Sequence, residues 1–177
     1  MALLDHLEMP APIIRPATLA DLPALTTIYN HYVLQTTITF DLRPFLPDER
    51  RGWFDEHGTT GRHRMLIAES GDGTPIGYAT TSRWRPKPAY DTTVEASVYC
   101  HPDATGQGVG TSLYAAIFES LAGADVHRVV AGISLPNAAS VRLHERFGFT
   151  LVGGFQEVGR KFDRYVDVAW FERALAF

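Results

Sequence analysis

A run of alternating glycines, Thr105-Gly106-Gln107-Gly108-Val109-Gly110, constrains the fold of this chain more than any other feature of its sequence. The residues before it, 91–100, alternate between two kinds of side chain as a strand does, and residues 109–121 carry apolar side chains at helical spacing. Glycine tolerates the backbone conformations that point consecutive N–H groups inward, and the start of the helix adds partial positive charge. The segment therefore predicts a strand, an anion-binding loop and a helix, in that order.

Two common phosphate-binding motifs do not fit this loop. No Gly-Lys-Ser/Thr follows it, which excludes a Walker A loop. The glycine spacing also differs from the dinucleotide fingerprint G-x-G-x-x-G, and no acidic ribose-binding residue stands at the tip of a next strand. Taken alone, three glycines in this spacing favour a plain glycine-rich turn over a phosphate site.

The remaining segments predict a mixed α/β chain. Residues 126–133 form a nearly unbroken apolar run, typical of a central strand covered on both faces. The expected strands cover 12–16, 64–69, 76–84, 91–100, 126–133, 149–158 and 162–171, and the expected helices run from Thr18 or Asp21 to 34, and over 47–56, 109–121 and 137–146. No repeat or linker divides the 177 residues. We expect a single domain over residues 1–177, with a loose leader over 1–12.

Charge and composition exclude several functional classes. The net charge of −4 leaves no basic footprint for nucleic acid or an anionic membrane surface. The single cysteine, Cys100, excludes an intrachain disulfide, and no apolar run approaches a membrane span of about 18 residues. Asp5 and Glu8 stand where a signal peptide needs positive charge, and the histidines show no metal-ligand spacing. We expect a soluble, cytoplasmic protein without a metal.

Three residues outside the loop make its functional interpretation more specific. Glu95 lies on the preceding strand, Asn137 at the next strand-to-helix junction, and His144 seven residues further on. With the loop they resemble the GCN5-related N-acetyltransferase (GNAT) family, whose acetyl-CoA motif Gln/Arg-x-x-Gly-x-Gly/Ala corresponds to residues 105–110. Thr105 departs from the usual Gln or Arg. The segment 137–149 is similar to the family's Asn-x-x-Ala/Ser…Tyr/His…Gly-Phe signature.

Shorter motifs resemble the family members that acetylate phosphinothricin and methionine sulfoximine, and the resemblance extends from 13 to 171. These motifs are Asn30-His31-Tyr32, Ala89-Tyr-Asp91, Thr93-Val-Glu95, Val98-Tyr99, Leu135-Pro-Asn137 and Ser140-Val-Arg142 with His144-Glu145. The resemblance implies direct transfer of an acetyl group from acetyl-CoA to the primary amine of a small amino-acid-like acceptor. Acetylation of a protein N-terminus or another amine is an alternative. A non-catalytic acyl-CoA-binding regulator is another, which the presence of both Glu95 and His144 disfavours.

The resemblance also implies an architecture. We expect a mixed, mostly antiparallel seven-stranded sheet with helices on both faces and a V-shaped splay between the fourth and fifth strands. Backbone groups freed by the splay need partners, which an extended ligand can supply. The residues implied for acetyl-CoA are Val98, Tyr99, Cys100 and Asn137 along the pantetheine arm, and Gly106, Gln107, Gly108, Val109, Gly110 and Thr111 around the pyrophosphate. Asn137 also suits a helix N-cap. The alternative architecture is a three-layer sandwich without a cleft.

Two residues are candidates for the chemistry. An alkyl ammonium must lose its proton before it attacks a thioester, and Glu95 suits this role if burial raises its pKa. A solvated strand carboxylate is the alternative. His144 stands where the wider family has a tyrosine that protonates the thiolate, so it is a proton donor, a second base or a buried core histidine. Tyr99 shares the face of Glu95 and lines the cleft or the core. Cys100 has no histidine partner of a nucleophile motif, so we exclude a cysteine acyl-enzyme.

Candidate acceptor contacts come from two other segments. The run 82–88 carries Arg85, which in the resemblance binds the acceptor carboxylate, and Lys87; a solvated charged surface is the alternative. Phe40, with Thr39, is the candidate apolar wall over the acceptor. The resemblance further implies a homodimer, to which the hairpin 162–171 contributes unless its alternating apolar residues are ordinary core.

Overall fold

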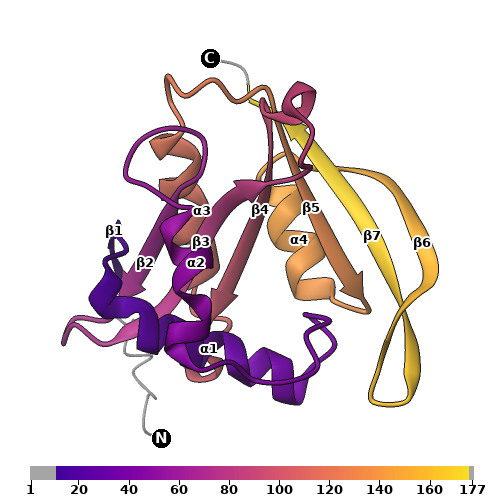
Figure 1. The fold of residues 1–177 in the computed structure, drawn as a ribbon, viewed down its shortest axis with the longest axis horizontal. Helices are drawn as coiled ribbons and strands as arrows, with labels where there is room; N and C mark the ends of the chain where they lie inside the picture. Colours follow the sequence, from indigo (N-terminus) through magenta and orange to yellow (C-terminus); the bar gives the residue numbers. More distant parts are fainter. Residues whose placement is uncertain (1–10, 176–177) are drawn as a thin grey trace, which may run out of the picture.

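The computed structural model describes residues 11–175, so most of the leader expected over 1–12 lies outside the described residues. Seven strands form one sheet in the order β1-β2-β3-β4-β5-β7-β6, and every neighbouring pair is antiparallel except β4 with β5 (Figure 1). The strands are β1 Ile13–Pro16, β2 Met65–Glu69, β3 Pro75–Arg83, β4 Thr93–Cys100, β5 Arg128–Leu135, β6 Thr150–Lys161 and β7 Arg164–Ala174. The expected mixed, mostly antiparallel seven-stranded sheet is confirmed.

The helices are α1 Leu22–Gln35, α2 Arg51–Asp55, α3 Val109–Ser120 and α4 Ala138–Arg146. The Asn137 side chain caps α4, and Gly148 follows its end with a φ of 78° that favours glycine. The helix expected over 47–56 is divided, because a 3₁₀ turn over Pro47–Arg50 precedes α2. Within residues 11–175, no helix is long and apolar enough to cross a membrane.

Three expected strands begin two residues late: β4, β5 and β7 start at Thr93, Arg128 and Arg164, whereas the sequence predicted starts at 91, 126 and 162. Residues 126 and 127 were expected in the strand that starts at Val126, but β5 begins at Arg128. The Val126 N–H is bonded to the Ala124 carbonyl in a turn, and the His127 N–H is bonded to the Thr92 carbonyl. An apolar residue at position 126 is explained by its burial in the core cluster that includes the end of α3, and not by strand pairing.

Helices cover both faces of the sheet, as expected (Figure 1). On one face, α1 and the aromatic residues of α2 pack over Met65, Ile67 and Tyr78. On the other face, α3 packs over Leu66 and Ala68, which alternate with the first set along β2, and α4 packs against β5. Two apolar clusters therefore sit on opposite sides of the central strands.

Strands β4 and β5 part after a short parallel contact. They pair only from Thr93 with Arg128 to Glu95 with Val130, while β5 goes on pairing with β7 as far as Leu135. The edge of β4 from Ala96 to Cys100 therefore faces a gap, although its other edge pairs with β3 along the whole strand. This confirms the expected splay between the fourth and fifth strands.

Candidate active site

Three connected cavities follow β4 through the split. The glycine-loop cavity, about 620 Å³, is lined by Tyr32, Ile38, Val98, Cys100, Ala104, Thr105, Gly106, Gly108, Val109, Gly110, Thr111, Asn137, Ala139, Ser140, Arg142, Leu143 and Arg146. The splay cavity, about 50 Å³, is lined by Ile38, Ala96, Ser97, Val98, Tyr99, Tyr114, Gly132, Ile133, Ser134, Asn137, Ser140 and His144. The aromatic cavity, about 290 Å³, is lined by Tyr29, Asp41, Phe45, Glu49, Arg50, Trp53, Tyr78, Thr80, Ser82, Ser97 and Tyr99.

The lining residues place these cavities in series. The splay cavity shares Val98 and Asn137 with the glycine-loop cavity, and it shares Ser97 and Tyr99 with the aromatic cavity. The side chains of neighbouring β4 residues point to opposite faces of the sheet. They line the same splay cavity because the edge of β4 that faces β5 is open there. The split thus connects the two faces of the sheet at β4.

The glycines of the loop serve two different purposes. Gly106 and Gly108 have φ values of 77° and 81°, which L side chains rarely adopt, and no heavy atom lies within 4 Å of a Cβ built there. Gly110 is needed for packing, because a Cβ there would lie 3.3 Å from the Leu143 side chain of α4. The first residues of α3, a 12-residue helix, line this cavity, and the first N–H groups of a helix have no intrahelical partners, although the Gly110 N–H is directed at the Cys100 thiol.

Gln107 differs from its neighbours in the loop. Its side-chain amide donates to the Asp103 carbonyl at 2.7 Å, and it does not line the glycine-loop cavity. Thr105, which replaces the family's Gln or Arg, donates its hydroxyl to the Pro102 carbonyl at 2.8 Å and does line the cavity. The side chains of Gln107 and Thr105 therefore stabilise the conformation of the loop. The hydrogen-bond donors that the loop can offer to a ligand are mainly its backbone N–H groups.

Two further residues of the glycine-loop cavity already have partners. The Cys100 carbonyl accepts a hydrogen bond of 2.6 Å from the Tyr32 hydroxyl. The Asn137 side-chain oxygen accepts from the Ser140 N–H at 3.1 Å, which makes Asn137 the N-cap of α4 and leaves its amide NH₂ on the cavity wall. Burial raises the pKa of the Cys100 thiol to about 11, so the thiol is protonated at neutral pH and is a poor nucleophile.

Glu95 lies half-buried on β4, opposite Ser82 of β3 and two residues before Ser97. Burial raises the pKa of its carboxyl group, and the positive charge of Arg85 opposes that rise. No group of residues 11–175 donates a hydrogen bond to the Glu95 carboxylate. An under-solvated carboxylate without a fixed partner is suited to accept a proton.

His144 is almost completely buried, with 3% of its surface exposed. Its Nδ1 lies 2.8 Å from the Ser140 carbonyl, so this nitrogen carries the hydrogen and donates it. The Nε2 of the neutral ring then accepts from the Tyr114 hydroxyl at 2.9 Å. Burial lowers the pKa of His144, which keeps the ring neutral at pH 7. His144 is thus both a satisfied buried histidine and part of the splay cavity wall.

Tyr114 and Ile38 were not among the sequence-predicted residues. Tyr114 comes from α3, is fully buried and lines the splay cavity beside His144. Ile38 lines both the splay and glycine-loop cavities from the segment after α1. Helical spacing places position 114 beside the apolar stripe of α3, but it does not show which group the hydroxyl meets.

The predicted acceptor residues are less tightly grouped. Arg85 is exposed, with its guanidinium 4.9 Å from the centre of the Trp84 ring, and its charge acts on Glu95. Lys87 is exposed and lines none of the three cavities. Phe40 is 37% exposed and lies against Gly159 of β6, where a Cβ would come within 2.4 Å of its ring. The structure therefore brings Arg85 close to Glu95, but none of Glu95, Arg85, Phe40 and Lys87 is among the residues that line the three cavities.

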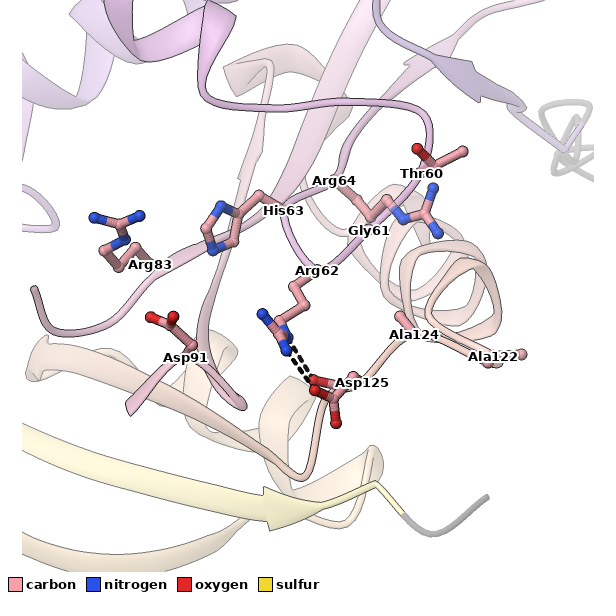
Figure 2. A pocket seen from close by; sticks show the side chains of 11 residues that line it. Thr60, Gly61, Arg62, His63, Arg64, Arg83, Asp91, Ala122, Ala124 and Asp125 are labelled. Carbon is pink, nitrogen blue, oxygen red and sulfur yellow. Dashed lines mark hydrogen bonds and ion pairs between the residues drawn. The ribbon is translucent and has the colours of Figure 1, made fainter. Parts of the chain in front are cut away.

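A separate hollow of about 550 Å³ lies beyond the C-terminal end of α3 (Figure 2). Figure 2 shows Arg62 directed at Asp125, with His63, Arg83 and Asp91 on the neighbouring wall. The glycine loop begins the same helix, so the hollow and the loop lie at opposite ends of α3. We assign this hollow no part in the candidate site.

Within residues 11–175, no group of three or more His, Cys, Asp or Glu side chains is arranged to hold a metal ion.

The comparisons with known proteins agree with this geometry. Residues 25–149 match the model of the family described as acetyltransferase (GNAT) family. The chain is 54% identical to a phosphinothricin N-acetyltransferase of Streptomyces coelicolor, over 92% of this chain and 95% of that protein. The chain belongs to the GNAT family. It is therefore an acetyltransferase, and the expected family is confirmed.

Other GNAT proteins are similar over nearly the same length. The chain is 38% identical to an L-methionine sulfoximine/L-methionine sulfone acetyltransferase of Pseudomonas aeruginosa, over 90% of this chain and 92% of that protein. Its fold matches a GNAT phosphinothricin acetyltransferase from Sinorhizobium meliloti, solved in complex with acetyl-CoA. That match has a TM-score of 0.88 at 31% identity, and it covers 93% of this chain and 89% of the solved one.

The Tyr114–His144 contact of this GNAT protein gives a testable prediction. Tyr114→Phe keeps the ring but leaves the buried His144 Nε2 without a donor, so we expect a loss of about 1–3 kcal/mol in the free energy of unfolding. Urea unfolding measures this loss. Nitrogen NMR of the wild type should show a neutral His144 with its hydrogen on Nδ1 at pH 7. A His144 that titrates above pH 6.5, or an unchanged stability in Tyr114→Phe, would contradict this assignment.

Proposed function

We propose that this protein transfers the acetyl group of acetyl-CoA to the α-amine of a small amino-acid-like acceptor of the phosphinothricin or methionine sulfoximine type. The observation that carries the proposal is the position of Glu95. Its half-buried carboxylate accepts no hydrogen bond from residues 11–175 and belongs to the last residue of β4 that pairs with β5, immediately before the split that joins a cavity at the glycine loop to a cavity on the other face. The names of the similar proteins support the same acceptor class.

The glycine-loop cavity fits acetyl-CoA. Backbone N–H groups of Gly106, Gly108, Val109, Gly110 and Thr111 would hold the pyrophosphate at the positive end of α3. The free edge of β4 at Val98 and Tyr99, the remaining backbone groups of Cys100 and the Asn137 amide would pair with the pantetheine arm. Gln107 supports the loop rather than the ligand, because its side chain is bonded to Asp103.

The residues of the split then divide the proton transfers between them. Bound acetyl-CoA supplies the acetyl group as a thioester. Glu95 takes a proton from the acceptor ammonium, directly or through a water molecule, which makes the amine nucleophilic. The Tyr114 hydroxyl is a donor on the wall of the splay cavity, and His144 holds it by accepting its hydrogen. To protonate the departing thiolate, the Tyr114 hydroxyl must turn its one hydrogen from His144 Nε2 to the sulfur and then recover a proton from water, because neutral His144 has no proton of its own to give at Nε2.

Arg85 is the proposed partner of the acceptor's α-carboxylate. It is near enough to Glu95 for its charge to act on that carboxyl group, and its exposed guanidinium can bind both carboxylate oxygens. Lys87, two residues further on, adds positive charge to the approach of the anionic acceptor. Phe40 lies on the segment that carries Ile38 into the split, and it forms the apolar wall over the entrance.

Glu95→Gln tests the proposed base. The amide keeps the shape of the side chain but cannot take a proton, so kcat should fall by about 10²- to 10⁴-fold, with little change in acetyl-CoA affinity. Burial raises the pKa of Glu95, so the wild-type kcat/KM should increase with pH through a range above the ordinary glutamate value as the carboxyl group deprotonates. The rate at which the CoA thiol is released measures both kcat and kcat/KM. A Glu95→Gln variant with near wild-type turnover, when chemistry is rate-limiting, would exclude Glu95 as the base.

Arg85→Ala should fail in a different way. Loss of a charge-assisted pair with the carboxylate, worth about 1.5–3 kcal/mol, should raise the acceptor KM and leave acetyl-CoA binding intact. Isothermal titration with CoA checks the second expectation. An acceptor analogue without the carboxylate is the matched control, because its kinetics should not respond to the substitution. Equal losses for both acceptors would contradict the assignment of Arg85.

We propose further that the protein is a homodimer that associates through its last hairpin. Apolar side chains stand more than half exposed along β6 and its turn with β7, and a stable monomer rarely leaves such a strip open. They are Leu151, Val152, Phe155, Val158, Phe162 and Tyr165. Light scattering at micromolar concentration should give twice the monomer mass of 19.6 kDa. A monomer mass would contradict the proposal.

We place the reaction in the cytoplasm. The chain has a single cysteine, Cys100, which leaves no possibility of an intrachain disulfide. Burial keeps that thiol protonated, as suits a structural cysteine in a reducing compartment.

A further inference from the structure

Arg50 carries an unusual buried positive charge. Only 6% of its surface is exposed, and its guanidinium lies 3.8 Å from the centre of the Trp53 ring and 4.4 Å from that of Tyr29. Its one hydrogen bond within residues 11–175 is a long one of 3.3 Å, from Nη1 to the Leu25 carbonyl. A guanidinium has five N–H donors and is always charged, so most of this donor capacity is unused. Arg50 lines the aromatic cavity.

The carboxylates of the same cavity do not neutralise Arg50. Asp41 accepts a hydrogen bond from the Tyr29 hydroxyl. Glu49 pairs with Arg43 at 3.0 Å and accepts from the Leu46 N–H at 2.7 Å. No carboxylate of residues 11–175 lies within 4.0 Å of the Arg50 guanidinium, and an unpaired buried charge is costly. Within the part of the chain that the structure describes, the Arg50 guanidinium is therefore left without a counter-charge in direct contact.

A second unpartnered group lines the same cavity. Tyr78 is 1% exposed, and its buried hydroxyl makes no well-formed hydrogen bond with the described residues, although the nearby Arg50 guanidinium opposes the rise that burial causes in its pKa. Tyr78 packs against Trp53, the ring that Arg50 stacks on. A buried hydroxyl without a partner is rare in a folded protein, and together with Arg50 it forms a pair of donors facing one space.

We propose that the aromatic cavity is a receptor for an anionic oxygen group at the far end of the acceptor's side chain, with Arg50 and Tyr78 as its donors. This inference rests on the proposed function. The cavity shares Ser97 and Tyr99 with the splay cavity, so an acceptor whose amine meets Glu95 extends its side chain toward Arg50. Arg85 would bind one acidic group of the acceptor and Arg50 the other. The preferred acceptor is therefore an amino acid whose side chain ends in a phosphinate or another anionic group.

Phosphinothricin and methionine sulfone form a matched pair of probes. Both carry the same α-amino acid unit, two methylene groups and a methyl-capped tetrahedral group with two oxygens. The phosphinate carries a negative charge and the sulfone does not, so a difference between the two acceptors isolates the charge at the far end.

Arg50→Met is the decisive variant, because Met fills the space between the aromatic rings without a charge. We expect the kcat/KM for phosphinothricin to fall about 10- to 100-fold more than that for methionine sulfone, mainly through KM. Tyr78→Phe should raise the KM of both acceptors several-fold, with little change in the melting temperature, since its hydroxyl makes no well-formed hydrogen bond within residues 11–175. Arg51→Met is the control: it removes an equal charge from the neighbouring residue, and neither Arg51 nor its ion-pair partner Asp55 lines the cavity.

The outcomes separate this inference from the proposed function. A wild type that acetylates neither compound contradicts the proposed acceptor class. The inference is then tested by calorimetry with CoA present, where Arg50→Met must weaken phosphinothricin binding more than sulfone binding. Equal losses for both compounds in Arg50→Met would overturn the inference, because they would place Arg50 on the shared carboxylate or in the scaffold. If Arg50→Met does not fold, an unchanged KM for both acceptors in Tyr78→Phe overturns it.

Discussion

The parting of β4 and β5 is the constraint on which the rest of this structure depends. Two parallel strands that pair at only three positions leave one strand with a free edge inside the protein. Buried backbone groups need partners, and the chain itself supplies few: the Tyr32 hydroxyl bonds one carbonyl, at Cys100. An extended ligand can supply the others. The same free edge lets residues from both faces of β4 line one continuous hollow, which is what a reaction between two substrates requires.

The two sides of the split have different physical characters. On the α3 side, the loop offers backbone N–H groups and the positive end of a helix, which suit a phosphate without the need for a lysine or arginine in the loop. On the α1 side, the cavity is walled by aromatic rings in edge-to-face contact around a buried guanidinium. Glu95 stands between them, where burial and the charge of Arg85 pull its pKa in opposite directions.

The sequence predicted those parts of the fold that follow from local pattern. Alternation along 91–100 and helical spacing over 109–121 correspond to β4 and α3, and Asn137 caps α4 as its residue type suggests. The error at Val126 arose because an apolar run shows burial but does not show where strand pairing begins. The split itself was expected from the family resemblance and not from any residue pattern.

The candidate site was less accessible to sequence reasoning, because its walls come from distant segments. Glu95, His144 and the loop glycines were found because short motifs carry them. Tyr114, Ile38 and Arg50 carry no such motif, and only the folded chain brings them to the cavities. Gln107 was placed in the cofactor site by its position in the motif, but its side chain bonds the Asp103 carbonyl and does not line the cavity. A position in a loop does not determine where a side chain points.

Hydrogen exchange of the backbone amides, measured with and without acetyl-CoA, tests the central role of the split most directly. Addition of acetyl-CoA should slow exchange over residues 96–100 and 108–112, which face the split and the start of α3, and leave residues 93–95 unchanged because β5 already pairs with them. Unchanged exchange over 96–100, with slowing confined to other segments such as the hollow around residues 61–64 and 122–125, would show that the cofactor does not occupy the split.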